Sequence, residues 1–295
     1  MTITGTVLLR EILSNSATYK NEFYLLVCYK TFNDIISLLS VIFLIKLPQW
    51  GILSNLYLNN NFLSSLSYFF GSSTGATTIL HTFFVSFIRF CALNYPIKYR
   101  MFFDSSKKKF LIIFMLIFCI CIGTPSLFFQ ACYVYVNLTN TVTPIIDTES
   151  ASFYQFFYVV VLYGIIISIT FGLNISNSIS YCKNTLNTIN KKKNEISFFF
   201  YSFFTFATAF CMETYLMIRI FGVFTGNETL ICLANKLLAW IGDISTLFDF
   251  YFFIYISPEI RITLKKTFKR KENKVTPNKL INKITVHNKN PTQIL

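Results

Sequence analysis

Six long apolar runs follow one another along the chain, and short polar segments separate them. Their first residues are Phe23, Ser65, Phe110, Phe153, Ile196 and Leu230. A helix needs about 20 apolar residues to cross the hydrocarbon core of a bilayer, and each run is that long. The pattern therefore predicts an all-α integral membrane protein whose transmembrane helical bundle occupies residues 23–256.

The polar segments between the runs are of two kinds. The basic segments are Tyr95–Lys109, Cys182–Glu195 and the tail that follows the last run. The segments without lysine or arginine are Gln49–Ser64, Tyr133–Ser152 and Thr225–Thr229. The two kinds alternate along the chain, as the positive-inside rule predicts for a multi-pass protein. We therefore place the basic segments on the cytoplasmic side and the others outside.

Two glycosylation sequons fall in the segments placed outside, and they begin at Asn137 and Asn227. Their position agrees with the charge rule, so we expect both to be glycosylation sites. A third sequon, at Asn174, falls at membrane depth, where no glycan is expected. Cys132 and Cys232 also fall near the outer side, and the sequence leaves open whether they pair.

The segment after the last run has a different pattern. Within residues 257–271, Ile260, Leu264 and Phe268 form an apolar stripe at helical spacing among lysines and arginines. This pattern is typical of an amphipathic helix that lies along an anionic inner leaflet. Residues 272–295 are polar and basic without periodicity, and they are predicted to be a disordered cytoplasmic tail.

Composition supports a membrane protein and argues against a nucleic-acid partner. Hydrophobic residues make up 54% of the chain and charged residues 13%, whereas soluble domains carry about 25% charged residues. The net charge of +13 resides in short segments beside the apolar runs. We therefore expect the basic residues to face a lipid bilayer and not nucleic acid.

The chain lacks the sequence patterns of the common enzyme and cofactor sites. It has no GxSxG, HExxH, P-loop or GxGxxG motif. His81 and His287 are its two histidines, and its eight cysteines are scattered without metal-ligand spacing. The sequence therefore predicts a protein that is not an enzyme and that binds no cofactor or metal.

The end of the second run carries an arginine, a proline and a tyrosine at suggestive intervals. Arg89 falls just inside the membrane boundary, Pro96 follows seven residues later, and Tyr99 comes three residues after that. A charge at this depth is costly and is often functional. The alternative is an anchoring arginine whose side chain extends to the lipid headgroups.

This spacing resembles the end of helix 3 in rhodopsin-like receptors, where an arginine that follows an acidic residue precedes proline and tyrosine at the same intervals. Here Ile88 occupies the acidic position. The wider resemblance is to nematode serpentine chemoreceptors, most closely class gamma (Srg). It rests on Phe32–Pro48, on Arg89–Tyr99 and on the order of the apolar blocks from Phe23 to Arg261.

The resemblance implies a seven-transmembrane fold in which residues 1–22 hold a truncated first helix and the inner loop after it. It also implies a chemosensory G-protein-coupled receptor in the plasma membrane, including that of sensory cilia. Such a receptor detects a small-molecule ligand from outside and signals through a heterotrimeric G protein inside. The residues of its inner-face switch would be Arg89, Pro96, Tyr99, Pro258 and Arg261.

Polar residues inside the apolar runs are candidates for the functional site. Asp34 and Asp249 are acidic residues at membrane depth, and Lys30 shares a helix face with Asp34. They either serve function or make structural contacts between helices. Depth and side select the candidate pocket residues Ser72, Thr74, Thr77, His81, Glu213 and Arg219. Small residues in this set are equally expected where helices pack closely.

Alternative interpretations remain open for the function and for the start of the chain. A transporter or channel would use a polar path through Asp34, Glu213, Arg219 and Asp249, although the chain shows no internal repeat. Residues 1–22 would also fit an interfacial helix at the start of a complete chain. A non-functional truncated receptor is the third alternative.

Overall fold

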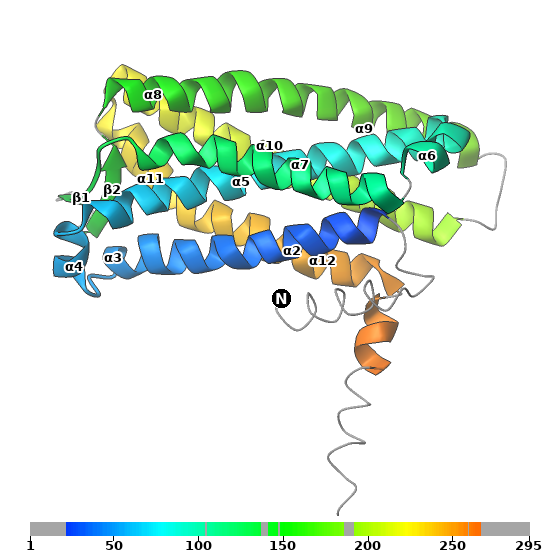
Figure 1. Cartoon of the computed structure of the whole chain (residues 1–295), viewed down its shortest axis with the longest axis horizontal. Helices are drawn as coiled ribbons and strands as arrows, with labels where there is room; N and C mark the ends of the chain where they lie inside the picture. The colour runs from blue at the N-terminus through cyan, green and yellow to red at the C-terminus, as the bar shows by residue number, and fades with distance from the viewer. Residues whose placement is uncertain are drawn as a thin grey trace, which may run out of the picture.

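The computed structural model describes residues 22–103, 105–136, 141–146, 148–185, 192–258 and 260–266. The predictions made for the truncated first helix in residues 1–22, for Asn137 and for the tail fall almost wholly outside these ranges. In the described part, long helices lie side by side and form one elongated bundle (Figure 1).

The bundle consists of helices, wide helical turns and one hairpin. In chain order these are α2 (Glu22–Val41), η2 (Ile42–Lys46), α3 (Leu47–Gln49), α4 (Ser54–Leu58), α5 (Asn61–Asn94), α6 (Pro96–Phe102), α7 (Ser105–Gly123), η3 (Thr124–Leu127), β1 (Ala131–Val136), β2 (Thr141–Ile146), α8 (Glu149–Phe156), η4 (Phe157–Tyr163), α9 (Gly164–Thr185), α10 (Lys192–Thr225), α11 (Glu228–Asp243), η5 (Ile244–Phe248) and α12 (Asp249–Ile256). The turns η2, η4 and η5 are π-helical, and η3 is a 3₁₀ turn.

Five helices of the described chain are long and apolar enough to cross a membrane. They are Phe23–Gln49, Asn61–Asn94, Lys109–Leu127, Glu149–Lys183 and Phe199–Thr225. They confirm the predicted multi-pass helical membrane protein. The sixth predicted span, Leu230–Ile256, forms a continuous helical run through α11, η5 and α12. It is not one of the five, and it contains three charged residues: Lys236, Asp243 and Asp249.

A β-hairpin occupies part of the segment that the sequence analysis placed in an outer loop. Strands β1 and β2 pair antiparallel, with Ala131 opposite Ile146 and Val136 opposite Thr141. The strands are short runs of valine, tyrosine, threonine and isoleucine, residue types that favour strands. The bundle is all-α, as predicted, whereas the hairpin was not predicted.

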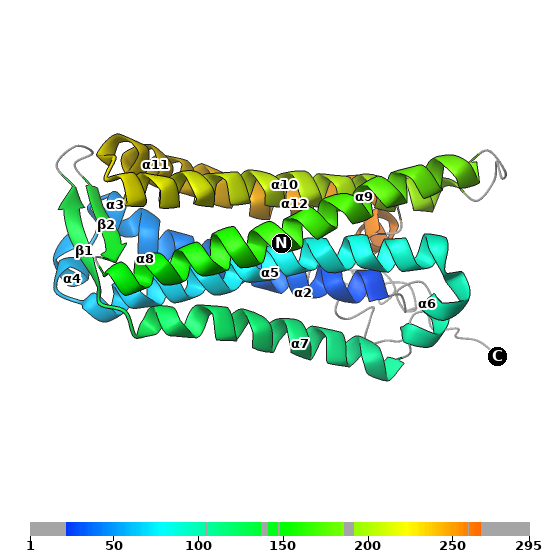
Figure 2. The same ribbon diagram turned by 90° about the horizontal axis from the view of Figure 1, so that it is seen from above.

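The hairpin closes one end of the bundle, which we call the hairpin end (Figure 2). The Tyr133 ring lies edge-on to Tyr57 of α4 with the ring centroids 5.2 Å apart. The Tyr133 hydroxyl donates a hydrogen bond to the carbonyl oxygen of Leu44, at 2.7 Å. Burial raises the pKa of the Tyr133 phenol, so the hydroxyl stays protonated and keeps this donor role. The bond ties the hairpin to α2 through η2.

Helix α5 is the central helix of the bundle and contacts α2, α7, α9 and α10. Its buried face is rich in serine and threonine and also includes Gly75 and Ala76. One consequence is a close approach to α7, where a Cβ added at Gly123 would lie 1.9 Å from Ser73 Oγ. This contact favours the helix-packing interpretation for part of the small-residue stretch.

The opposite end of the bundle, which we call the Arg89 end, is formed where α5 stops at Asn94. Tyr95 is not helical, and Pro96 begins the short helix α6. Proline suits the first turn of a helix because its missing N–H would have no intrahelical partner there. Figure 2 shows α6 at the opposite end of the bundle from the hairpin.

Candidate functional site

A group of three charges lies in the core of the bundle. The Lys30 ammonium donates a hydrogen bond to Asp34 and lies 3.8 Å from Asp249 Oδ2. Thr208 Oγ1 donates to Asp249 Oδ1 at 3.3 Å. The side chains of Lys30, Asp34 and Asp249 are each 3% exposed. The structure thus brings both predicted aspartates together around one lysine, which links α2 to α12, and Thr208 connects this group to α10.

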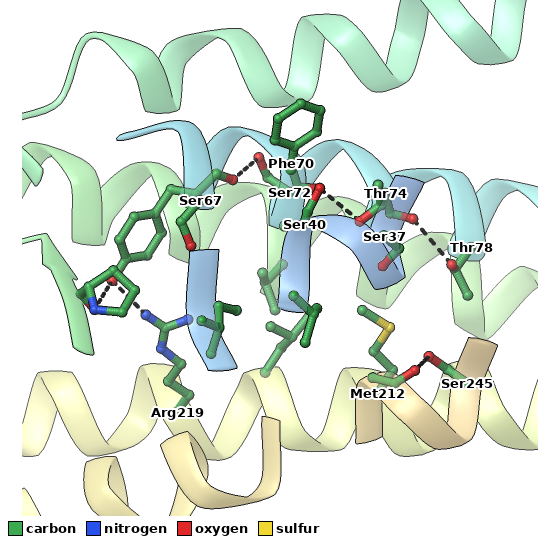
Figure 3. A pocket seen from close by; sticks show the side chains of 18 of the residues that line it. Ser37, Ser40, Ser67, Phe70, Ser72, Thr74, Thr78, Met212, Arg219 and Ser245 are labelled. Atoms are coloured by element: carbon green, nitrogen blue, oxygen red, sulfur yellow. Dashed lines mark hydrogen bonds between the residues drawn. The ribbon is translucent and has the colours of Figure 1, made fainter. Parts of the chain in front are cut away.

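A cavity lies nearer the hairpin end, with a volume of about 130 Å³. Helices α2, α5, α10 and α11, the strand β2 and the wide turns η4 and η5 all contribute to its walls. Of the predicted pocket residues, Ser72, Thr74 and Arg219 line it. Figure 3 shows the labelled hydroxyl side chains along its walls, with Arg219 toward one end and Ser245 and Met212 toward the other.

Three predicted pocket residues are not among those that line this cavity. Thr77 Oγ1 donates to the carbonyl oxygen of Ser73 in its own helix, at 3.1 Å. His81 is fully buried, and its ring lies edge-on to Tyr201 with centroids 6.3 Å apart. Glu213 is 5% exposed, and within the described residues neither carboxylate oxygen has a hydrogen-bond partner. A depth estimate from sequence says neither which way a side chain points nor where along each helix the cavity ends.

Arg219 is the positively charged residue of the cavity wall, and its guanidinium contacts the side chain of Tyr68. One terminal nitrogen of its guanidinium donates to the Tyr68 hydroxyl at 3.1 Å. The guanidinium carbon also lies 5.5 Å from the centroid of the Tyr68 ring, which is within cation–π range. Tyr68 in turn donates to the carbonyl oxygen of Pro144 in β2, at 2.9 Å. The hairpin therefore helps to orient the arginine.

Hydroxyl groups cover much of the remaining wall, and several donate to their own helices. Ser72 donates to the Tyr68 carbonyl at 2.8 Å, and Thr74 donates to the Phe70 carbonyl at 2.7 Å. Thr78 donates to the Thr74 carbonyl at 3.2 Å. Because a hydroxyl has one donor and two lone pairs, these groups can still accept hydrogen bonds.

An ion pair lies beside the cavity and joins η2 to α11. The Lys46 ammonium lies 3.0 and 2.8 Å from the two carboxylate oxygens of Asp243. Gly242, next to Asp243, and Ile45, next to Lys46, both line the cavity. The carboxylate of Asp243 is therefore engaged by Lys46, not by Arg219.

Three π-helical turns border the cavity. Each turn supplies lining residues: Ile45 from η2, Tyr158, Val159 and Tyr163 from η4, and Ser245 and Thr246 from η5. Single π turns inside α-helices occur frequently at functional sites. Their coincidence around one cavity supports a binding role for it.

The predicted switch residues lie at the Arg89 end. Arg89 is half-buried near the end of α5, and Pro96 and Tyr99 belong to α6. Pro258 and Arg261 follow α12, whose end lies on the same side of the bundle (Figure 1). The structure thus gathers the predicted set at one end of the bundle, away from the cavity.

A hydrogen-bonded junction adjoins Arg89 and was not predicted as a site. Ser86 Oγ and Ser202 Oγ lie 3.2 and 3.0 Å from the Asn174 side-chain oxygen. The Asn177 side-chain nitrogen donates to the Ser86 carbonyl at 3.0 Å. These contacts join α5, α9 and α10 three residues before Arg89.

Sequence reasoning missed several cavity residues. Ser37 and Ser40 are three residues apart in α2 and share a helix face, so their spacing is a usable signal. Tyr68 has no such signal, because aromatic residues make up 18% of the chain. Thr143 and Pro144 reach the wall through the hairpin, which was itself not predicted.

Cys132 of β1 is a free thiol, and the side chain of Cys232 lies outside the described residues. Asn227 caps α11 by accepting hydrogen bonds from the backbone nitrogens of Thr229 and Leu230, at 3.1 and 3.2 Å. It lies at the hairpin end, where the sequence analysis expects a glycan.

A family model of serpentine type seven-transmembrane GPCR chemoreceptors of class Srv matches residues 3–270. A search of curated proteins found no match. The predicted resemblance to serpentine chemoreceptors is therefore confirmed, whereas the assignment to class gamma (Srg) is not, because Srv is a different class. The chain belongs to the Srv family of serpentine seven-transmembrane chemoreceptors.

Proposed function

We propose that this chemoreceptor binds a small-molecule ligand in the cavity near the hairpin end and signals to a heterotrimeric G protein at the Arg89 end. The observation that carries the proposal is the cavity itself. It combines a charged side chain, hydroxyl groups and apolar side chains such as Met212 and Leu216. Small-molecule sites typically combine apolar wall with polar groups that fix the orientation of the ligand.

Two helices give the cavity a physical connection to the other end. Helices α5 and α10 both line it, and both extend to the Arg89 end, where Ser86 and Ser202 meet at Asn174. A ligand that contacts these helices more favourably in one arrangement shifts the population toward that arrangement. The partner at the Arg89 end would then recognise the changed positions of α5, α6 and α10.

The arrangement of charges gives the transporter alternative no support. Lys30 engages Asp34 and Asp249 in the core, and Lys46 engages Asp243. Arg219 lies apart from them against Tyr68. The residues proposed for a polar path therefore form separate groups, so we do not propose transport.

The test fills the cavity with a bulky side chain. Gly71 lines the cavity, and a Cβ added there meets no atom within 4 Å. Gly172 in α9 offers the same freedom and does not line the cavity, so Gly172→Trp is a matched control. Wild type and both variants are expressed in cells with a G-protein reporter and exposed to a small-molecule library.

We expect compounds that activate wild type and Gly172→Trp and do not activate Gly71→Trp. Activation that survives Gly71→Trp would place the ligand elsewhere. If the wild type is correctly inserted and activates no G protein with any compound, the result would favour the alternative of a non-functional truncated receptor. Ion or solute flux through the wild type would favour the transporter.

A further inference from the structure

The ligand cavity holds a positive charge without a carboxylate partner among the described residues. The ion pairs among the described residues join Lys30 with Asp34 and Asp249, and Lys46 with Asp243. Arg219 belongs to none of them. An arginine side chain stays protonated in proteins, and a charge at membrane depth is costly unless it is paired. The charge balance of the cavity is therefore incomplete.

We infer that the cavity recognises small carboxylic acids in their ionised form, with Arg219 as the counter-ion. This inference rests on the proposed ligand site and names the class of ligand that occupies it. A carboxylate would supply the missing negative charge, and the flat fork of the guanidinium matches its two oxygens.

The surroundings of Arg219 hold the guanidinium in place and leave it donors for a ligand. It has five N–H donors, and the hydrogen bond to Tyr68 uses one of them. The Tyr68 hydroxyl donates its hydrogen bond to the Pro144 carbonyl oxygen. Its oxygen therefore accepts the hydrogen bond from Arg219. A fixed donor group costs less conformational entropy on binding than a mobile one.

The rest of the cavity limits the body of the acid. Its volume is about 130 Å³, and an apolar cavity of about 150 Å³ holds a benzene molecule in another protein. Val159, Met212, Leu216 and Ile220 provide apolar wall. A single aromatic ring or a short alkyl chain attached to the carboxylate suits both the size and the chemistry.

Other ligand charges fit less well. A cationic ligand would place a second positive charge beside Arg219. A neutral amide would leave the arginine without a counter-charge. A phosphate with two negative charges would need a second cation, and the nearby Lys46 is already engaged by Asp243. The monoanionic carboxylate is the class that these contacts favour.

The test compares acids with amides of the same shape. Purified receptor in lipid nanodiscs is heated with benzoate or benzamide, and with butyrate or butyramide, over a range of concentrations. The variants are Arg219→Gln and, as a control that removes a positive charge far from the cavity, Lys98→Gln. Lys98 is exposed in α6 at the Arg89 end.

We expect at least one acid to raise the melting temperature of wild type and Lys98→Gln at concentrations where its amide has no effect. Removal of one partner of a buried charge pair typically costs enough binding free energy to weaken affinity by roughly 30-fold or more. Arg219→Gln should therefore lose the acid response by that factor while its unliganded melting curve remains cooperative.

Equal stabilisation by acids and amides, an unchanged acid response in Arg219→Gln, or no stabilisation by either acid would overturn the inference. The G-protein assay separates this failure from failure of the proposed function. Suppose that neutral compounds activate the receptor, and that Gly71→Trp removes their effect while Arg219→Gln keeps it. That result would support the proposed ligand site and refute the preference for acids. If the acids bind through Arg219 and evoke no signal, the inferred recognition of carboxylates is supported and the proposed signalling function is refuted.

Discussion

Replacing Lys30 with methionine is the sharpest test of the charged group in the core. The substitution keeps a long, flexible side chain and removes the positive charge. Lys30, Asp34 and Asp249 are each 3% exposed, so water does not compensate for the loss. Among the described residues, Lys30 is the cation within ion-pair distance of both carboxylates.

The expected magnitude follows from the burial of the group. Removing one partner of a buried ion pair costs about 3–5 kcal/mol, because the other charge stays buried without compensation. Here two carboxylates lose their cation, although Thr208 still donates to Asp249. We therefore expect Lys30→Met to lower the stability by at least about 3 kcal/mol, which corresponds to a melting temperature lower by roughly 6 °C or more.

The assay is thermal unfolding of the purified receptor in lipid nanodiscs. The triple variant Lys30→Met, Asp34→Asn, Asp249→Asn removes all three charges, so it should recover most of the loss. Lys98→Met removes an exposed charge and should change the stability by less than about 0.5 kcal/mol. A stable Lys30→Met variant, or a triple variant no more stable than the single one, would refute the reasoning.

Three further predictions concern single contacts. Glu213→Gln should leave the melting temperature unchanged or raise it, because the buried carboxylate has no hydrogen-bond partner among the described residues; a loss above about 1 kcal/mol would reveal a hidden partner. Gly123→Ala should lower the stability by about 1–3 kcal/mol through overpacking against Ser73, and adding Ser73→Gly should restore part of it; no loss in the single variant would contradict the close approach. Thr229→Ala should abolish glycosylation of Asn227 in cells and keep the helix cap, whereas Asn227→Ala should also cost about 1 kcal/mol; equal stability of the two variants would argue against the cap.

The sequence predicts the bundle well because membrane crossing depends on length and polarity, which are read along the chain. Five of the predicted spans are helices of the required length. The hairpin escaped prediction because each strand is only six residues long and gives a much weaker signal than the long apolar runs beside it. The pairing of Ala131 with Ile146 depends on contacts across the turn, which composition does not reveal.

The site was predictable only in part, for a related reason. Lys30 and Asp34 are four residues apart on one helix, so their contact follows from helical geometry. Asp249 joins them from α12, and the meeting of two distant helices has no signature in one sequence. Thr74 and Thr77 share nearly the same depth, yet only Thr74 lines the cavity. The rotation of each helix about its axis decides that difference, and packing sets the rotation.

The three π-helical turns around the cavity have a consequence for how this receptor can diversify. A π turn closes its hydrogen bonds over one residue more than an α-helical turn does. Deleting one residue from η2, η4 or η5 would return that turn to regular α-helical winding, and the helix beyond it would keep nearly the same faces, because the deleted residue is the extra one of the wide turn. One such deletion would change the side chains that the turn itself presents to the cavity, while the rest of the helix keeps the faces that it presents to its neighbours and to lipid. Insertions and deletions at these turns therefore offer an evolutionary route to new ligand selectivity, alongside the substitution of single residues.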